Sequence, residues 1–176
     1  MLRKISLGLA ALFLLVVLGA YLLPSTLRVH RMIEIAAPPG DVFAVVNRLD
    51  RLNEWSPWYA LDPDAAYAVE GPKGGVGQRL SWQSAHEQVG TGSQEIVQSI
   101  PDQLVQTELD FGEMGGGSAA FELAAQGAGT QIVWRFETDL GMNPIARYMG
   151  LMMDDLIGTD YEKGLANLKK LIETGD

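Results

Sequence analysis

Few side chains in this sequence could carry out acid–base or metal chemistry, and they do not group into known motifs. The 176 residues include two histidines, His30 and His86, and no cysteine. A cysteine nucleophile, a thiolate metal site and a disulfide framework are therefore excluded. Two histidines without a His/Glu spacing make a poor zinc site. We expect solvated or packing roles for both histidines, no metal and no cofactor.

Carboxylates are the other groups that could transfer protons. Most acids in the strand-like segments share a face with polar neighbours, so we expect them to point to water. Glu34 on the first strand-like segment and Glu54 beside a tryptophan are better placed to face inward. Together with His30, they are the candidates for proton transfer, and no catalytic residue is assigned.

Two tryptophans, Trp55 and Trp58, frame a proline in the segment WSPW. Pro57 disfavours a helical backbone at Ser56 and fixes the local path, which holds both rings in place. Two interpretations stay open. Either Trp55 or Trp58 lines a cavity or its mouth, or both rings pack the preceding short helices onto a sheet.

Two glycine-rich segments separate strand-like stretches. GPKGGVGQ, residues 71–78, lacks the G-x-x-x-x-G-K-[ST] pattern of a phosphate loop, and no helix follows it. We interpret it as a hairpin turn. GEMGGGS, residues 112–118, is a second hairpin, and its looseness could gate a cavity.

The charge of the chain excludes one class of partner. The net charge is −9, and beyond the two basic residues near the start, Arg3 and Lys4, the chain carries 11 basic and 22 acidic residues. Such a surface repels phosphate backbones. We therefore expect no nucleic-acid binding and no broad electrostatic docking onto anionic lipid.

Residues 1–24 differ in composition from the rest of the chain. Arg3 and Lys4 precede an uncharged, mostly apolar run from Ile5 to Leu23, closed by Pro24. Nineteen residues of helix extend about 28 Å, close to the hydrocarbon thickness of a bilayer. We expect an uncleaved, single-pass transmembrane anchor, with a cleaved signal sequence as the alternative. The flanking charges predict a cytoplasmic N-terminus and an extracytoplasmic, periplasmic domain at the cell membrane.

Residues 25–176 show the pattern of one α+β domain. The segment LRVHRMIEI predicts a strand, and residues 41–54 predict two short helices. Period-two patterns then predict antiparallel strands at 65–70, 78–84, 90–100, 104–111, 118–125 and 130–139. The last segment returns to a helical period, with Ile145, Met149, Met152 and Leu156 followed by Tyr161, Leu165, Leu168 and Ile172. Gly158 would bend or divide this helix.

Four segments resemble one known family: IEIAAPPGDVFAVVNRLDRLNEWSPW, GPKGGVGQRLSW, GTQIVWRF and GTDYEKGLANLKKLIE. Together they are similar to the polyketide cyclase/dehydrase-like branch of the START/SRPBCC superfamily, from residue 28 to the end of the chain. The resemblance implies the helix-grip fold, in which a curved antiparallel sheet of six to seven strands wraps around a long C-terminal helix and encloses an apolar cavity. It provides no invariant catalytic set.

We expect the cavity to be lined by aromatic and methionine side chains: Trp55, Trp58, Trp82, Phe121, Trp134, Phe136, Met149, Met152 and Met153. Flexible, polarizable methionines suit ligands of variable shape. The leading hypothesis is a membrane-anchored protein that binds a hydrophobic or amphipathic molecule, lipid or polyketide-like, without chemistry. The alternatives are a cyclase or dehydratase that uses the same cavity, and a membrane-tethered protein-interaction module with an unknown partner.

Overall fold

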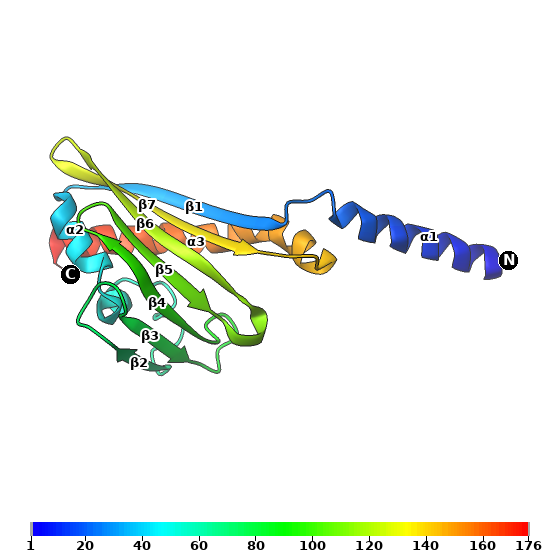
Figure 1. The fold of residues 1–176 in the computed structure, drawn as a ribbon, viewed down its shortest axis with the longest axis horizontal. Coiled ribbons are helices and arrows are strands. Elements are labelled where there is room, and N and C mark those ends of the chain that lie inside the picture. The colour runs from blue at the N-terminus through cyan, green and yellow to red at the C-terminus, as the bar shows by residue number, and fades with distance from the viewer. Residues whose placement is uncertain (1, 176) are drawn as a thin grey trace.

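The computed structural model describes residues 2–175 and contains one curved sheet with a long helix across its inner face (Figure 1). The elements are, in chain order, α1 (Leu2–Ala20), β1 (Thr26–Ile35), α2 (Pro39–Val46), the 3-10 helix η1 (Leu49–Glu54), β2 (Ala66–Glu70), β3 (Arg79–Gln83), β4 (Thr91–Ile100), β5 (Leu104–Asp110), the 3-10 turn η2 (Gly112–Met114), β6 (Gly116–Gln126), β7 (Gly129–Asp139) and α3 (Pro144–Thr174). This is the predicted α+β, helix-grip-like architecture.

The sheet is antiparallel throughout, with strand order β1-β7-β6-β5-β4-β3-β2. The six strands predicted after residue 64 match β2 to β7 within two residues at either end. The register between β4 and β5 shifts at Val97, and a bulge of this kind bends a strand. The residues 71–78 form the predicted turn between β2 and β3, where a side chain at Gly71 would lie 2.3 Å from the Gly77 carbonyl oxygen.

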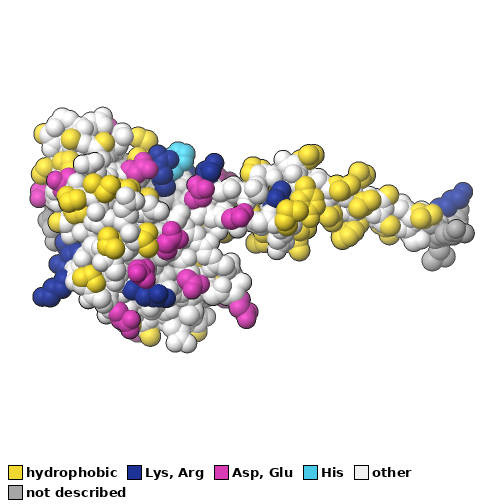
Figure 2. All heavy atoms as spheres, in the orientation of Figure 1, with side chains coloured by type: hydrophobic (Ala, Val, Ile, Leu, Met, Phe, Trp, Pro, Cys, Tyr) yellow, Lys and Arg dark blue, Asp and Glu magenta, His cyan; other side chains and the backbone are white. Residues whose placement is uncertain are grey.

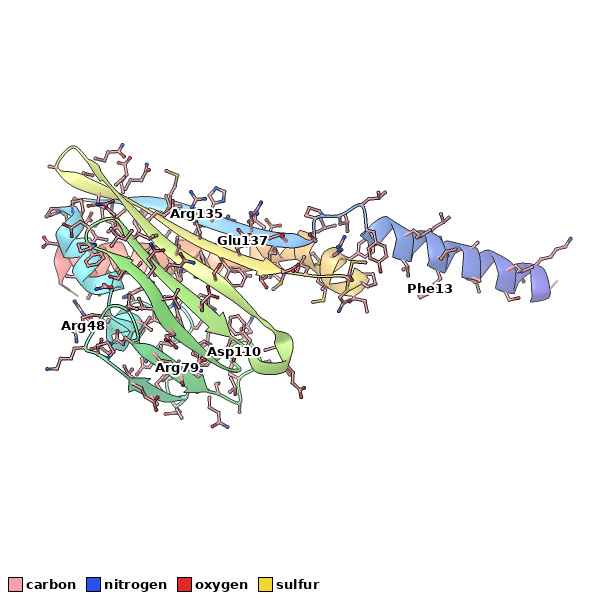
Figure 3. The ribbon with its side chains drawn as sticks, viewed as in Figure 1. Phe13, Arg48, Arg79, Asp110, Arg135 and Glu137 are labelled. Carbon is pink, nitrogen blue, oxygen red and sulfur yellow. The ribbon has the colours of Figure 1, made fainter. Side chains whose placement is uncertain are left out.

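The two faces of the sheet differ in polarity. On β7, Ile132, Trp134 and Phe136 are buried on the inner face, while Arg135 and Glu137 point outward. The outer face carries ion pairs between neighbouring strands, Arg28–Glu137, Arg135–Glu122 and Arg79–Glu95. Figure 3 labels Arg79, Arg135 and Glu137. The carboxylates in these pairs therefore face solvent, as the polar residues on the same face predicted.

α3 is one continuous helix of 31 residues, so Gly158 does not divide it. The Asn143 side chain accepts hydrogen bonds from the Ile145 and Ala146 amides, which caps the helix N-terminus. Gly158 instead lies against the Arg31 guanidinium, which pairs with Glu162 (2.7 Å) and Asp154 (3.4 Å). This contact fixes α3 over β1.

α1 extends away from the domain at the end where α3 begins (Figure 1). It ends at Ala20, since residues 21–23 form a turn, so its uncharged part is three residues shorter than the apolar run that we counted. Among residues 2–175, no helix combines the length and the apolar character needed to cross a membrane. The transmembrane helix that we predicted is therefore not supported.

The junction between α1 and the domain is held by tyrosine and arginine side chains. The Tyr148 hydroxyl donates to the Val16 carbonyl (2.9 Å), and the Tyr21 hydroxyl donates to the Met142 carbonyl (3.3 Å). The buried Arg147 donates to the carbonyl oxygens of Gly141 and Leu23 and lies 5.3 Å from the centre of the Tyr21 ring. α1 is thus fixed to the first turn of α3.

A buried glutamine positions η1. Gln78 is 1% exposed; its Oε1 accepts from the Leu49 amide (2.7 Å), and its Nε2 donates to Asp50 (2.9 Å). Hydrogen bonds from Arg48, and then from Gln78, lower the pKa of Asp50 from 3.8 to about 2. The charged form of Asp50 therefore holds the segment that leads into WSPW.

Because the folded pKa of Asp50 is depressed, we expect its contribution to stability to be present above about pH 4 and lost as the pH falls through 2. Asp50→Asn should therefore lose less stability than the natural protein between pH 5 and 2, as measured by denaturant unfolding at each pH. Asp64→Asn, at an exposed position, is the matched control. Parallel pH profiles for Asp50→Asn and the natural protein would contradict the assignment.

α3 approaches the sheet closely at Gly164. A β-carbon there would lie 2.8 Å from a Trp134 ring carbon and 3.2 Å from Pro57 Cδ, and neither neighbour is a flexible chain end. We expect Gly164→Ala to destabilise the fold by about 1–3 kcal/mol despite the better helix propensity of alanine. At Gly158 the same change meets only the guanidinium of Arg31, which can move, so the loss should be smaller. Equal unfolding free energies for the two variants would contradict this packing.

Candidate functional site

A cavity of about 310 Å³ lies between the inner face of the sheet and α3. Its walls come from the strands (Tyr67, Leu80, Trp82, Gln94, Leu109, Phe136), from η1 and the segment after it (Leu52, Asn53, Ser56, Trp58), from α3 (Met153, Ile157, Tyr161) and from the β3–β4 and β5–β6 connections (Glu87, Gln88, Val89, Gly90, Phe111, Met114). Most of these side chains are apolar or aromatic. Pockets for small organic molecules have this size and character.

The mouth of the cavity lies between two loops. Glu87 and Gln88 from the β3–β4 loop are exposed, and so is Met114 from η2. Met114 Cε would lie 4.0 Å from a β-carbon at Gly90, so the two loops lie side by side. The segment GEMGGGS is therefore at the mouth, where we expected a flexible hairpin could act. Trp82, whose Nε1 donates to the Val89 carbonyl (3.2 Å), supports the β3–β4 loop from below.

The two tryptophans of WSPW lie in different surroundings. Trp55 is 2% exposed and packs edge-on against Phe121 and Trp134, with ring centroids 5.8 and 5.4 Å away. Its carbonyl oxygen accepts from Asn167 Nδ2 of α3 (3.2 Å). Trp58 lines the cavity and packs against Trp134 and Tyr161. Trp55 is thus a clamp between η1, the sheet and α3, while Trp58 forms part of the wall.

Four of the nine residues predicted to line the cavity do so: Trp58, Trp82, Phe136 and Met153. Trp55, Phe121 and Trp134 lie in the core beside the cavity and do not contribute to its wall. The indole N–H groups of Trp55 and Trp134 are buried and have no hydrogen-bond partner within residues 2–175.

Met149 and Met152 lie outside the cavity wall, on the exposed side of α3, with 57% and 67% of their surface accessible. The face of α3 that meets the sheet contains Tyr161, Leu165 and Leu168, and steps of four residues back from Tyr161 lead to Ile157 and Met153. Ile157 and Tyr161 are wall residues that the sequence analysis did not assign, and extending this stripe backward would have found both.

The three residues considered for proton transfer lie outside the cavity. His30 is exposed on β1, and Glu34 is exposed and accepts from Gln126 Nε2 (3.1 Å). Glu54 is exposed and pairs with Arg51 (2.6 Å), whose hydrogen bond lowers the pKa of that carboxyl. None of the three lines the cavity, and in the described part of the chain no group of three His, Asp or Glu side chains could hold a metal ion.

The interior of the cavity is therefore uncharged. Glu87, at the exposed mouth, is the one lining residue with a formal charge among those that the structure describes. Burial raises the pKa of the Tyr67 and Tyr161 hydroxyls, so both stay protonated at neutral pH. Such a site can hold and orient a neutral molecule, while charged groups would lose hydration there without a compensating partner.

The fold is shared with solved structures of low sequence identity. The structure of the Aha1 dimer from Colwellia psychrerythraea matches with a TM-score of 0.58 at 20% identity, over 85% of this chain and 98% of that one. CalU16 from Micromonospora echinospora matches with a TM-score of 0.57 at 16% identity, over 84% of this chain and 77% of that one. The di-domain ARO/CYC StfQ from the steffimycin biosynthetic pathway matches at 0.62 and 11%, over 84% of this chain and 51% of that one.

No curated protein matches the chain. The family described as "Polyketide cyclase / dehydrase and lipid transport" matches residues 26–173, which span β1 to α3 and include every wall of the cavity. The chain therefore belongs to the polyketide cyclase/dehydrase and lipid transport family.

Proposed function

We propose that this domain binds a hydrophobic or amphipathic small molecule, lipid or polyketide-like, in the cavity between the sheet and α3, without chemistry on it. The observation that carries the proposal is the apolar and aromatic wall of the cavity, which has a volume of about 310 Å³. This volume lies at the lower end of the range for ligand pockets, so the site suits a small ligand or one part of a longer one.

The family description and one structural relative support the class of ligand. The family is described by polyketide chemistry and by lipid transport, and StfQ belongs to a biosynthetic pathway. A cyclase or dehydratase would also need an acid or a base beside the substrate. Because His30, Glu34 and Glu54 lie outside the cavity and the one lining carboxylate among the described residues, Glu87, is exposed at its mouth, binding without catalysis is the simpler function for this site.

The cavity can be tested with N-phenyl-1-naphthylamine, a neutral apolar dye whose fluorescence rises in an apolar site. We expect the natural protein to bind one equivalent. Met153→Trp should narrow the cavity and weaken binding by about tenfold or more, since the ring would take part of the space of the ligand. Met149→Trp, four residues away on the exposed side of α3, is the control and should bind normally. A natural protein that binds no dye, or equal affinities for both variants, would contradict the proposal.

We also propose that α1 attaches the domain to a membrane, with the domain on the extracytoplasmic side as the flanking charges predict. α1 exposes nine large apolar side chains, whose spacing of about 100° per residue distributes them around the helix: Ile5, Leu7, Leu9, Leu12, Phe13, Leu14, Leu15, Val16 and Leu18. Figure 2 shows apolar side chains along the visible face of α1. In Figure 3, Phe13 lies well away from the domain. A helix that is apolar all round is otherwise buried in a core or in lipid.

Membrane attachment can be tested by flotation with phosphatidylcholine vesicles, whose neutral surface does not repel an acidic domain. We expect the full chain to float with the vesicles and the double variant Leu9→Asp, Phe13→Asp to stay at the bottom of the gradient, because two carboxylates in lipid are costly. A matched control introduces two aspartates at Met32 and Val76, exposed positions outside α1. Flotation of the α1 variant together with its control would refute attachment through α1.

A further inference from the structure

One polar pair interrupts the apolar inner face of the sheet. Gln94 on β4 is 8% exposed and lines the cavity, and Thr107 on β5 is 1% exposed. Their inward neighbours on the same strands, Ile96, Val105 and Leu109, are apolar. A polar side chain in such a place is normally fully hydrogen-bonded, so the partners of each of its atoms indicate its role.

The hydrogen bonds of this pair fix the orientation of the Gln94 amide. Thr107 Oγ1 lies 3.4 Å from the Ala119 carbonyl oxygen, which can only accept, so the single hydroxyl proton is donated to it. Thr107 must then accept from Gln94 Nε2, at 2.9 Å. The amide nitrogen of Gln94 is thereby directed to the sheet. Its carbonyl oxygen, Oε1, accepts no hydrogen bond from residues 2–175, and the residue lines the cavity.

A buried phenol on the opposite wall complements this acceptor. Tyr161 of α3 is 4% exposed and lines the cavity, and its ring is stacked on Trp134 with centroids 3.7 Å apart and planes 12° apart. The stack and the close approach of Gly164 to the same indole hold the ring in place. No group in the described chain receives a hydrogen bond from its hydroxyl, which stays protonated because burial raises its pKa.

We propose that Gln94 Oε1 and the Tyr161 hydroxyl form a polar recognition site inside the cavity, with Gln94 accepting a hydrogen bond from a neutral hydroxyl group of an otherwise apolar ligand. The inference rests on the proposed binding function and narrows its ligand to an alcohol or a phenol. Tyr161 donates to the oxygen of the same group or to a second oxygen of the ligand.

The same geometry selects against carboxylates such as free fatty acids. No lysine or arginine of the described residues lines the cavity, and Gln94 offers an oxygen to the incoming group. An ionised carboxylate would lose its hydration and would meet the lone pairs of Oε1. A hydroxyl donates a hydrogen bond to Gln94 Oε1 and introduces no charge. The cavity therefore distinguishes ligands by whether they carry a neutral hydrogen-bond donor.

The test compares four naphthalene probes of similar size by competition against N-phenyl-1-naphthylamine at pH 7. 2-Naphthol carries a neutral hydroxyl that can donate and accept a hydrogen bond, and 2-methoxynaphthalene can only accept one. 2-Methylnaphthalene can neither donate nor accept a hydrogen bond, and 2-naphthoate carries a negative charge. We expect the natural protein to bind 2-naphthol about fivefold or more tightly than 2-methylnaphthalene, as one hydrogen bond to a buried acceptor provides. 2-Naphthoate should bind more weakly than both.

Two variants assign the preference to its residues. Gln94→Met keeps the length of the side chain and removes Oε1, so 2-naphthol should lose its advantage over 2-methoxynaphthalene, while both still accept a hydrogen bond from Tyr161. Tyr161→Phe should remove the preference for 2-methoxynaphthalene over 2-methylnaphthalene. Gln98→Met, at an exposed position on the same strand, is the control and should retain both preferences.

The outcomes separate this inference from the proposed function. If the natural protein binds none of the probes, both fail. If it binds all four with equal affinity, the cavity is a ligand site and the polar recognition site is refuted. Should Gln94→Met fail to fold, the comparison of 2-naphthol, 2-methylnaphthalene and 2-naphthoate in the natural protein still decides the question.

Discussion

The stack of Tyr161 on Trp134 sets the distance between α3 and the sheet, and the rest of the structure depends on that distance. At 3.7 Å between ring centroids, the two rings are in contact, and Gly164 one turn later has no side chain to separate helix and strand. Trp55 and Phe121 enclose the same indole from the sides. From this point toward the N-terminus of α3, Arg31 keeps the helix in contact with β1, and the cavity occupies the space between α3 and the inner face of the other strands.

The aromatic cluster also explains why the segment WSPW needs both tryptophans. Trp55 packs on Trp134, and its carbonyl oxygen accepts a hydrogen bond from Asn167 of α3. Trp58, three residues later, lies at the boundary with the cavity. Pro57 contacts the same surface, since its Cδ lies 3.2 Å from the place of a β-carbon at Gly164. The segment is held from the other side by η1, whose first amide is bound by the buried Gln78. A loop therefore forms a rigid part of the wall because polar contacts fix its start and aromatic contacts fix its end.

Period-two and helical patterns predicted the strands and α3 well because each element has one buried face and one solvent-exposed face. They predicted the site less well because lining a cavity and filling a core require the same apolar residue types. Trp134 and Phe136 lie on the same face of β7, yet only Phe136 reaches the cavity, and the difference depends on where α3 crosses the sheet. Met149 and Met152 continue an apolar stripe that is exposed. Gln94 had no signal in the sequence, because its role depends on Thr107 from another strand and Tyr161 from α3.

The first half of α3 connects the two parts of the proposed function. One side of it, Met153 and Ile157, is cavity wall, and the other side exposes Ile145, Met149, Met152 and Leu156 next to the point where Tyr148 and Arg147 hold α1. Contact of such an apolar surface with lipid is more favourable than its contact with water. If α1 lies in a membrane, the same contacts hold this side of α3 near the lipid, and the cavity wall is formed by the other side of the same helix. Attachment through α1 would therefore keep the half of α3 that lines the cavity close to the bilayer, in which apolar molecules dissolve, and this gives a reason for joining an apolar helix to a domain of this fold.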